Sequence, residues 1–394
     1  MSKQVKIGVL GLGNMGHSHA KRLFAGECPE IQLTAVCDIK PDRLEWAKDL
    51  FGDSVSYFSD GDEMIQSGAI DALLVAVPHY DHPTYAIKAM KQGLHVMIEN
   101  PAGVYTEQVL EMNRVADECG VVFAIMMNQR TNCIYRKMRE IIQSGELGAI
   151  RRTSWIITNW YRPQAYYDSG DWRATWSGEG GGVLLNQCPH NLDLWQWICG
   201  MPKSVEAHLH FGKWHNIEVE DDVTAYVEYE NGATGTFITS TGDTPGTNRF
   251  EITCDKGKII AEIDENGSSL SMWKSEIGEP EFSATNEKQF GHPSYEKTSV
   301  PTDGENTQHM GVLRAFAANI LRDEALVADG REGINGLTIS NAMHLSAWTG
   351  KVIDLASFDH KLYRTELMKR VAASRRKTAT SAAVAADMSS TFGS

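Results

Sequence analysis

The chain has 394 residues, of which 42% are hydrophobic and 22% charged, and its formal net charge is -14. This length exceeds what one hydrophobic core usually holds, so we expect two domains. The acidic balance argues against binding to nucleic acid or to an anionic membrane surface, because both select basic patches. Seven cysteines without a CxxC pair indicate reduced thiols, so we expect a cytoplasmic protein with neither disulfides nor a bound metal.

Short apolar stretches alternate with amphipathic ones over the first 128 residues. Strands are predicted at 5–11, 33–38, 70–78, 95–99 and 121–127, and helices between them at 41–51, 82–92 and 105–119. Near-continuous apolar strands separated by amphipathic helices indicate a parallel sheet covered on both faces. We therefore predict a doubly wound α/β domain over residues 1–128.

The sequence GLGNMG follows the first strand and sets Gly11, Gly13 and Gly16 in the spacing G-x-G-x-x-G. A strand before the loop, a helical pattern after it and an acidic residue ending the next strand indicate a dinucleotide-binding Rossmann domain. Gly11 permits the tight turn, Gly13 lets a pyrophosphate approach the backbone, and Gly16 lets the helix pack closely on the strand. The alternative is a tight strand-to-helix turn that binds no ligand.

The acidic residue is Asp38, at the end of the second strand. It would accept hydrogen bonds from both hydroxyls of the adenosine ribose, and its charge would repel a 2′-phosphate. NAD is thus the predicted cofactor rather than NADP, although Lys40 and Arg43 temper this preference. Asn14 and Met15 open the helix, where free N–H groups would bind the phosphates.

The pattern changes after residue 128. A helix is predicted at 130–144, and longer strands with polar alternation follow it. In the segment 222–240, alternate residues are apolar and would share one face of a strand: Val223, Ala225, Val227 and Tyr229. Asn231-Gly232 then predicts a tight hairpin turn. Further helices are predicted at 308–322 and 332–350.

We predict a second, α+β domain with a mainly antiparallel open sheet over residues 129–356. Helices would cover one face of this sheet. Residues 357–394 form a C-terminal extension, and its small, polar end from residue 374 is expected to be a flexible tail or a partner-contacting arm.

A glycine-rich segment, GEGGG at 178–182, leads into a predicted helix. On that helix Asn186, His190 and Asp193 would share one face, beside apolar residues that pack inward. His190 could take or give a proton near neutral pH, so it is a candidate acid/base. The alternative is a buried histidine whose hydrogen bonds are satisfied by Asp193.

The segment NWYRPQAYYDSGDWRATW, residues 159–176, contains six aromatic residues with arginine and aspartate between them. Aromatic faces stack on sugar C–H surfaces while charged groups bind hydroxyls, so this segment suits a carbohydrate or glycoside substrate. The predicted substrate contacts are Tyr161, Arg162, Tyr167 and Trp176. An oligomer contact, or a structural loop packed on the sheet, is the alternative.

Several motifs in this order resemble the Gfo/Idh/MocA oxidoreductases. They are GVLGLGNMG (8–16), DALLVAVPHYDH (71–82), ENPAG (99–103), ELGAI (146–150) and GGGVLLNQCPHNLD (180–193), and the resemblance covers roughly residues 4–355. It implies a substrate held between a Rossmann domain and an open-sheet domain, and oxidation or reduction of a ring alcohol of a sugar or cyclitol. The free sheet face would serve a homo-oligomer, a dimer or tetramer.

The resemblance also assigns residues. His190 matches the catalytic histidine of the family, and Glu99-Asn100-Pro101 matches its E-K-P motif, with Glu99 near the nicotinamide ribose. The remaining cofactor contacts it implies are Pro78, His82 and Asn128. The substrate contacts would include Asn100, His190 and Asn186, the last of which stands where many members have an acidic residue.

Asn100 is a departure, because the family lysine holds the reacting hydroxyl and can relay its proton. An asparagine donates a hydrogen bond but neither carries charge nor accepts the proton, and losing such a donor typically costs about 10²–10³ in rate. Three explanations stay open: redox chemistry with His190 as sole acid/base, an NAD-dependent glycoside hydrolase or lyase with a transient ketone, and an impaired variant. A non-catalytic dinucleotide-binding protein is a further alternative. His79 and His82 have metal-like H-x-x-H spacing, but ordinary loop roles are preferred.

Overall fold

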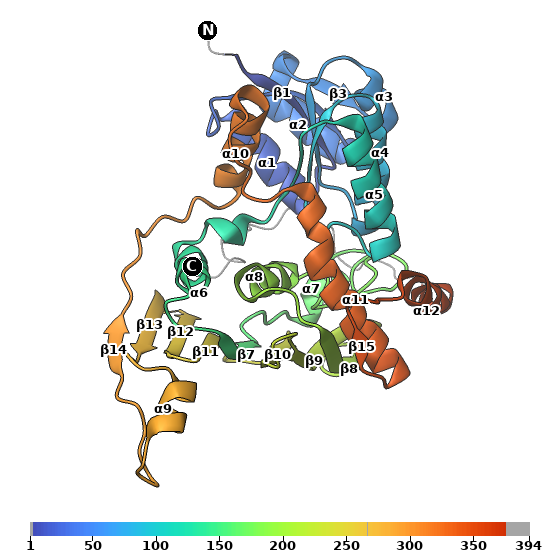
Figure 1. Ribbon diagram of the computed structural model, residues 1–394. Coiled ribbons are helices and arrows are strands. Elements are labelled where there is room, and N and C mark those ends of the chain that lie inside the picture. Colours follow the sequence, from blue (N-terminus) through green and yellow to red (C-terminus); the bar gives the residue numbers. More distant parts are fainter. Residues whose placement is uncertain (1–2, 266, 376–394) are drawn as a thin grey trace.

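The computed structural model describes residues 3–265 and 267–375, which form two sheets with helices packed on them (Figure 1). Most of the C-terminal tail expected from residue 374 therefore lies outside the described residues. The predicted fold class is confirmed, since the first sheet is parallel and the second is mostly antiparallel.

Six parallel strands form the first sheet, in the order β3-β2-β1-β4-β5-β6. The strands are β1 (Val5–Leu10), β2 (Ile31–Cys37), β3 (Ser56–Phe58), β4 (Ala72–Val75), β5 (His95–Ile98) and β6 (Phe123–Ile125). The helices between them are α1 (Asn14–Phe24), α2 (Pro41–Phe51), α3 (Gly61–Gln66), α4 (His82–Lys91) and α5 (Thr106–Cys119). The strand order reverses between β1 and β4, and open α/β sheets bind ligands beyond the carboxyl ends of the strands at such a point.

The second sheet has nine strands in the order β14-β13-β12-β11-β7-β10-β9-β8-β15. They are β7 (Ile150–Ile157), β8 (Ser204–Phe211), β9 (Glu220–Glu228), β10 (Thr234–Ser240), β11 (Asn248–Cys254), β12 (Gly257–Asp264), β13 (Gly267–Lys274), β14 (Glu296–Ser299) and β15 (Ile353–Asp354). Neighbouring strands are antiparallel except for β7 and β10. The predicted hairpin is confirmed, since β9 and β10 pair on either side of Asn231-Gly232 and Val223, Ala225 and Val227 are buried.

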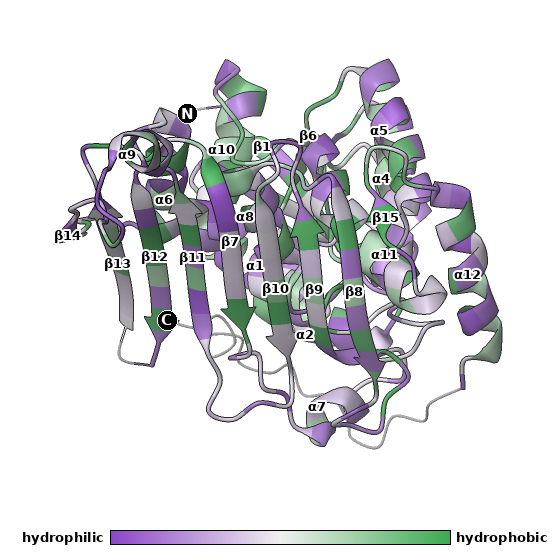
Figure 2. Ribbon diagram, turned by 60° about the horizontal axis from the view of Figure 1, so that its bottom comes forward, coloured by the Kyte–Doolittle hydropathy of each residue, from purple (hydrophilic) through white to green (hydrophobic). Residues whose placement is uncertain are grey.

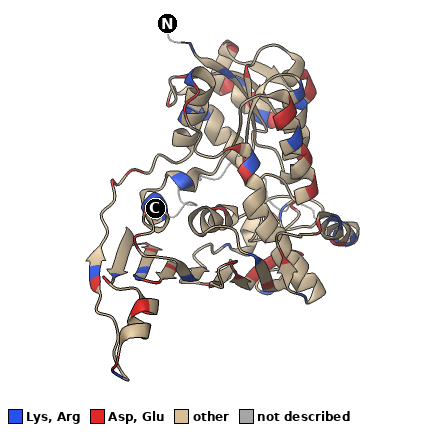
Figure 3. Ribbon diagram, in the orientation of Figure 1, with Lys and Arg blue, Asp and Glu red and all other residues tan. Residues whose placement is uncertain are grey.

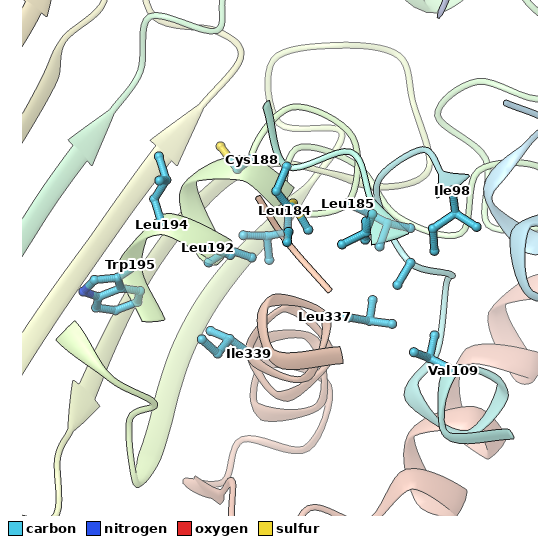
Figure 4. Packing of buried hydrophobic residues seen from close by; sticks show 14 of the residues in the cluster. Ile98, Val109, Leu184, Leu185, Cys188, Leu192, Leu194, Trp195, Leu337 and Ile339 are labelled. Carbon is cyan, nitrogen blue, oxygen red and sulfur yellow. The ribbon is translucent and has the colours of Figure 1, made fainter. Parts of the chain in front are cut away.

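Helices cover one face of this sheet, and among residues 3–265 and 267–375 none lies on the other, which is called the bare face (Figures 1 and 2). The covering helices are α6 (Cys133–Ser144), α8 (Pro189–Cys199) and α11 (Gly333–Thr349). Two stacked aromatic pairs lie in the core beneath these helices. The ring centres of Trp195 of α8 and Phe237 are 5.3 Å apart, and those of Trp155 and Phe250 are 4.1 Å apart. Figure 4 shows part of this apolar cluster, in which Leu192 of α8 faces Ile339 of α11. The short helix α9 (Glu279–Thr285) and the helix α12 (His360–Ala373) lie at the periphery (Figure 1), and the short helix α7 (Gln164–Asp168) lies at one end of the second sheet (Figure 2).

The helix predicted at 308–322 exists with these bounds, as α10 (Gln308–Arg322), but it packs on the first sheet. Its residues Met310, Leu313 and Phe316 share a buried cluster with Val5 and Ile7 of β1. The chain thus returns from the second sheet to complete the first core. The division at residues 128 and 129 stays a prediction, and α10 belongs by its packing to the earlier part.

Along the outer helices of the described chain, positions with Lys or Arg alternate with positions with Asp or Glu (Figure 3). Within the part of the chain that the structure describes, no helix is both long enough and apolar enough to cross a membrane.

Candidate active site

The glycine loop turns directly from β1 into α1. Gly11 has a φ of +89°, in the left-handed region that favours glycine, and a Cβ there would lie 2.5 Å from the carbonyl oxygen of Ala76. A Cβ on Gly16 would overlap the carbonyl oxygen of Gly11. Gly13 is the N-cap of α1 and no side chain caps the helix, so Asn14 and Met15 lie in a first turn whose N–H groups are open to a ligand.

Replacing Gly16 by alanine is expected to weaken NAD binding at least about tenfold, because the methyl group pushes α1 away from the loop. Calorimetric titration with NAD measures the change. Gly278→Ala is the matched control, since a Cβ there meets no atom within 3.6 Å and the residue lies in the second domain. Unchanged affinity in Gly16→Ala would show that the loop does not hold the cofactor.

Asp38 is buried beside the glycine loop. One carboxylate oxygen, Oδ2, accepts from the N–H of Leu12 at 2.7 Å and from Nη1 of Arg43 at 3.0 Å, and Oδ1 accepts from the N–H of Lys40 at 2.9 Å. These bonds fix the carboxylate at the carboxyl end of β2. Two carboxylate oxygens have about four acceptor positions, so capacity remains for a ribose hydroxyl.

His82 joins two loops of the first domain. Its ring nitrogens lie 2.8 Å from the carbonyl oxygen of Pro101 and 2.7 Å from that of Val77. Burial lowers the pKa of His82, and the two carbonyls oppose that shift. Because both nitrogens are occupied, its predicted contact with the cofactor can only be indirect, through the position of these loops. Pro78 is exposed at the start of the same segment.

Glu99 and His19 form a buried pair at the carboxyl end of β5. Their side chains approach to 2.5 Å between Oε1 and Nε2, and His19, on the glycine-loop helix, is 1% exposed. Burial by itself would raise the pKa of Glu99, but the hydrogen bond from His19 and the nearby histidines hold it below its ordinary value. Glu99 is thus an anion next to Asn100, whose backbone N–H lies 3.3 Å from Oε2.

Asn100 and His190 meet although 90 residues separate them. Nδ2 of Asn100 donates to the carbonyl oxygen of Met126 at 3.1 Å and lies 3.3 Å from Nε2 of His190. The carbonyl can only accept, so the atom facing it is the amide nitrogen, and Nε2 of His190 is then the acceptor. The imidazole proton therefore sits on Nδ1, which is buried without a hydrogen-bond partner in the described chain.

The pKa of His190 lies below the usual 6.5, because burial disfavours the charged ring more than Glu99 and Asp193 favour it. The ring is therefore neutral at pH 7, and its unprotonated Nε2 accepts a hydrogen bond from the Asn100 amide. A neutral imidazole beside an amide donor can accept a proton from a hydroxyl group placed against both.

One expectation about this helix is wrong, and the alternative that Asp193 satisfies His190 is contradicted as well. Helix α8 begins at Pro189, so Asn186 precedes it and does not share its face. Proline favours the first helical position and disfavours helical backbone before it, so Pro189 was the local signal for this start. His190 is not hydrogen-bonded to Asp193, whose two carboxylate oxygens accept from Arg130 at 2.7 and 2.8 Å.

Asn186 instead belongs to a polar cluster beside the start of α8. Its Nδ2 donates to Oε1 of Glu179, and its Oδ1 accepts from the hydroxyl of Tyr166 at 3.3 Å and from Nε2 of Gln187 at 3.1 Å. Glu179 was not anticipated, although it is the only charged residue inside GEGGG. Burial raises its pKa, while Arg173 and its hydrogen bonds lower it, and the net shift is upward.

The four predicted substrate contacts in the aromatic segment divide into two pairs. Tyr167 and Trp176 are buried: the Tyr167 hydroxyl lies 2.8 Å from Oγ1 of Thr241, and the Trp176 ring packs on Trp348 at 5.6 Å. The positions of Tyr167 and Trp176 do not support direct contact with a substrate, because both side chains are packed inside the protein. Tyr161 and Arg162 retain exposed surface.

Asn128 lies at the end of the first domain and is fully buried. Its Nδ2 donates to Oε1 of Gln308, and its Oδ1 has no hydrogen-bond partner among the described residues. A buried acceptor of this kind is satisfied when a ligand brings a donor. Together with the glycine loop and Asp38, it fits a dinucleotide such as NAD.

Two family models match the chain in the order of its domains. "Oxidoreductase family, NAD-binding Rossmann fold" matches residues 5–127, and "GFO/IDH/MocA C-terminal domain" matches residues 135–260, together more than half of the sequence. The chain belongs to the Gfo/Idh/MocA family. It is an NAD(P)-dependent oxidoreductase, as the resemblance of its motifs implied.

Relatives in the Gfo/Idh/MocA family act on sugars and cyclitols. The D-glucoside 3-dehydrogenase of Escherichia coli is 24% identical over 90% of this chain and 98% of its own length. The NADP-dependent scyllo-inositol 2-dehydrogenase of Bacillus subtilis is 26% identical over 86% of this chain and 92% of its own. The WlbA dehydrogenase of Bordetella pertussis, solved with NADH and UDP-GlcNAcA, has a TM-score of 0.75 and 27% identity, covering 91% and 100% of the two chains.

Proposed function

We propose that this protein oxidises or reduces a secondary ring alcohol of a sugar or glycoside, with NAD as cofactor and His190 as the acid/base. The contact that carries the proposal is the one between Asn100 Nδ2 and His190 Nε2, 3.3 Å apart at the end of β5. The known relatives act on sugars and cyclitols, and the D-glucoside 3-dehydrogenase among them favours a glycoside.

Bound NAD supplies the hydride acceptor for oxidation. As the carbon–hydrogen bond breaks and its electron pair leaves, the hydroxyl oxygen must lose its proton to form the ketone. His190 takes this proton on Nε2, which is unprotonated because Asn100 donates to it and burial lowers the pKa of the ring. Asn100 keeps one N–H on Met126 and turns the other toward the substrate oxygen, so that it donates without charge.

Asp38 supports NAD over NADP, because a fixed buried anion repels a 2′-phosphate. The bare face of the second sheet supports a homo-oligomer, since helices cover only its other face.

Lysine at position 100 tests the role of the amide. Asn100→Lys is expected to raise the oxidation rate by about 10²–10³, because a cation stabilises the developing alkoxide more than an amide does. The measurement is NADH absorbance, with both proteins offered NAD and a panel of methyl glycosides, free sugars and inositols. Asn100→Gln, which keeps the amide, is the matched control.

Each outcome of this comparison has a meaning. A native chain that produces NADH supports redox chemistry with His190 as sole acid/base. Turnover only in Asn100→Lys identifies Asn100 as a disabling residue. Cleavage of a glycoside without net NADH would replace the proposal by a hydrolase or lyase with a transient ketone. If neither protein transfers a hydride to NAD nor cleaves any compound of the panel, the proposal is overturned.

A further inference from the structure

Two arginines contact the same tyrosine ring beside the start of α8. The guanidinium carbon of Arg173 lies 4.6 Å from the ring centre of Tyr166, and that of Arg162 lies 5.3 Å from it. Arg162, Tyr166 and Arg173 are here called the arginine–tyrosine cluster. The Tyr166 hydroxyl accepts from Nη1 of Arg173 at 2.8 Å and from Nε2 of Gln187 at 3.3 Å.

The cluster is hydrogen-bonded to the segment that carries His190. Gln187 lies three residues before His190 in the sequence, and Tyr166 is hydrogen-bonded to it. A second tie comes from Trp160, whose ring centre is 5.5 Å from the guanidinium carbon of Arg162 and whose Nε1 donates to Oδ1 of Asn191 at 3.3 Å. Asn191 directly follows His190 on α8, so both aromatic neighbours of Arg162 are bonded to the segment that carries the base.

The two arginines differ in their charge partners. Arg173 forms an ion pair with Glu179, with 3.9 Å between Nη1 and Oε1. Arg162 donates to the carbonyl oxygen of Tyr161 at 2.9 Å, and within residues 3–265 and 267–375 no carboxylate lies within ion-pair distance of it. The acidic residue nearest to Arg162 in the sequence is Asp168, and its carboxylate accepts a hydrogen bond from Nε2 of Gln164 at 3.1 Å. A chain with a net charge of -14 thus keeps a guanidinium without a carboxylate partner, and both of its aromatic neighbours are bonded to residues that flank His190.

We propose that Arg162 binds an anionic group, a carboxylate or a phosphate, carried by the sugar substrate. The inference rests on the proposed function and narrows its substrate to acidic sugars. The planar guanidinium can donate two parallel N–H bonds to either a carboxylate or a phosphate. Because the Arg162 side chain already contacts two aromatic rings, it loses less conformational freedom when the anion binds. Tyr166, held by Arg173 and Gln187, keeps the Arg162 side chain beside the sugar site.

Three sugars that differ at one carbon test the proposal: methyl β-D-glucoside, methyl β-D-glucuronide and the 6-phosphate of the glucoside. Their dissociation constants are measured by calorimetry on the NADH-loaded protein, so that the result does not depend on turnover. At least one acidic sugar is expected to bind about tenfold or more tighter than the neutral one. The sugar that binds tighter identifies the anion.

Variants then assign the preference to Arg162. In Arg162→Gln the ratio between neutral and acidic dissociation constants should fall to about one, and Arg162→Lys should keep part of it because the charge remains but the fork is lost. Arg151→Gln removes the same charge at the opposite end of β7, where Arg151 pairs with Glu279, and should keep the full ratio.

The proposal is overturned if the glucoside binds as tightly as both acids, if the preference survives in Arg162→Gln, or if none of the three sugars binds. NADH formation is followed separately on the same compounds. Oxidation of the neutral glucoside without acid preference would leave the proposed function standing and reject this inference. A preference for the acid without any hydride transfer would support this inference and count against the proposed function.

Discussion

Replacing His190 by alanine is expected to lower the rate of hydride transfer by about 10²–10⁴, the usual contribution of a positioned general base. The reason is local: Nε2 of His190 is the unprotonated nitrogen beside Asn100, and no other imidazole is hydrogen-bonded to that amide in the described chain. The measurement is NADH formation with the sugar found active, in the native chain or in Asn100→Lys, together with the dissociation constant for NAD, which should not change.

The pH profile separates a base from a merely structural histidine. A base must be neutral, and the pKa of His190 is lowered from 6.5 by burial. Oxidation should therefore be at its plateau at pH 7 and fall only as the pH drops through this lowered pKa, and this decline should disappear in His190→Ala. His208→Ala, on the bare face of β8, is the control and should behave as the native chain. A native rate in His190→Ala would remove His190 from the mechanism.

Replacing Asp193 by alanine is expected to lower the free energy of unfolding by about 3–5 kcal/mol, the cost of leaving one member of a buried ion pair alone. Arg130 and Asp193 are 3% and 1% exposed and are joined by two hydrogen bonds. In the variant the guanidinium would keep the carbonyl oxygen of Val327 at 3.5 Å and one charged partner among the described residues, Glu332 at 2.8 Å, whose side chain is 40% exposed. Urea unfolding followed by tryptophan fluorescence measures the loss.

Two further variants make this prediction specific. Asp117→Ala breaks an ion pair with Arg331 in which the Asp117 side chain is 67% exposed, and should cost no more than about 1 kcal/mol. Replacing both partners together, Arg130→Met with Asp193→Leu, should recover part of the loss because no buried charge is left unpaired. A loss in Asp193→Ala no larger than that in Asp117→Ala would contradict the argument.

The same pair lies beside the proposed site. Asp193 lies three residues after His190 on α8, and Arg130 lies in the segment that follows β6, so the ion pair fastens the helix that carries His190 to the end of the first domain. Asn128 is in that segment as well, with its unpaired Oδ1. The cofactor side and the substrate side of the proposed site are thus joined by one buried contact.

Local features of this protein could be predicted from the sequence. The glycine loop, the hairpin at Asn231-Gly232 and the bounds of α10 each depend on neighbouring residues, through turn geometry, cross-strand alternation or helical periodicity. The proximity of Asn100 to His190 was implied by the family motifs. Spacing along the chain does not contain it, because 90 residues lie between them.

The tertiary structure decided how those elements are used. Its place in the sequence predicts that helix α10 belongs to the second domain, but the helix packs on the first. An amphipathic pattern shows that a helix has an apolar face and does not show which sheet that face contacts. His82 spans two carbonyls, and Asp193 pairs with Arg130 rather than with His190. Partners in a buried ion pair are chosen by the folded geometry, and the sequence by itself determined only which residues were available to form one.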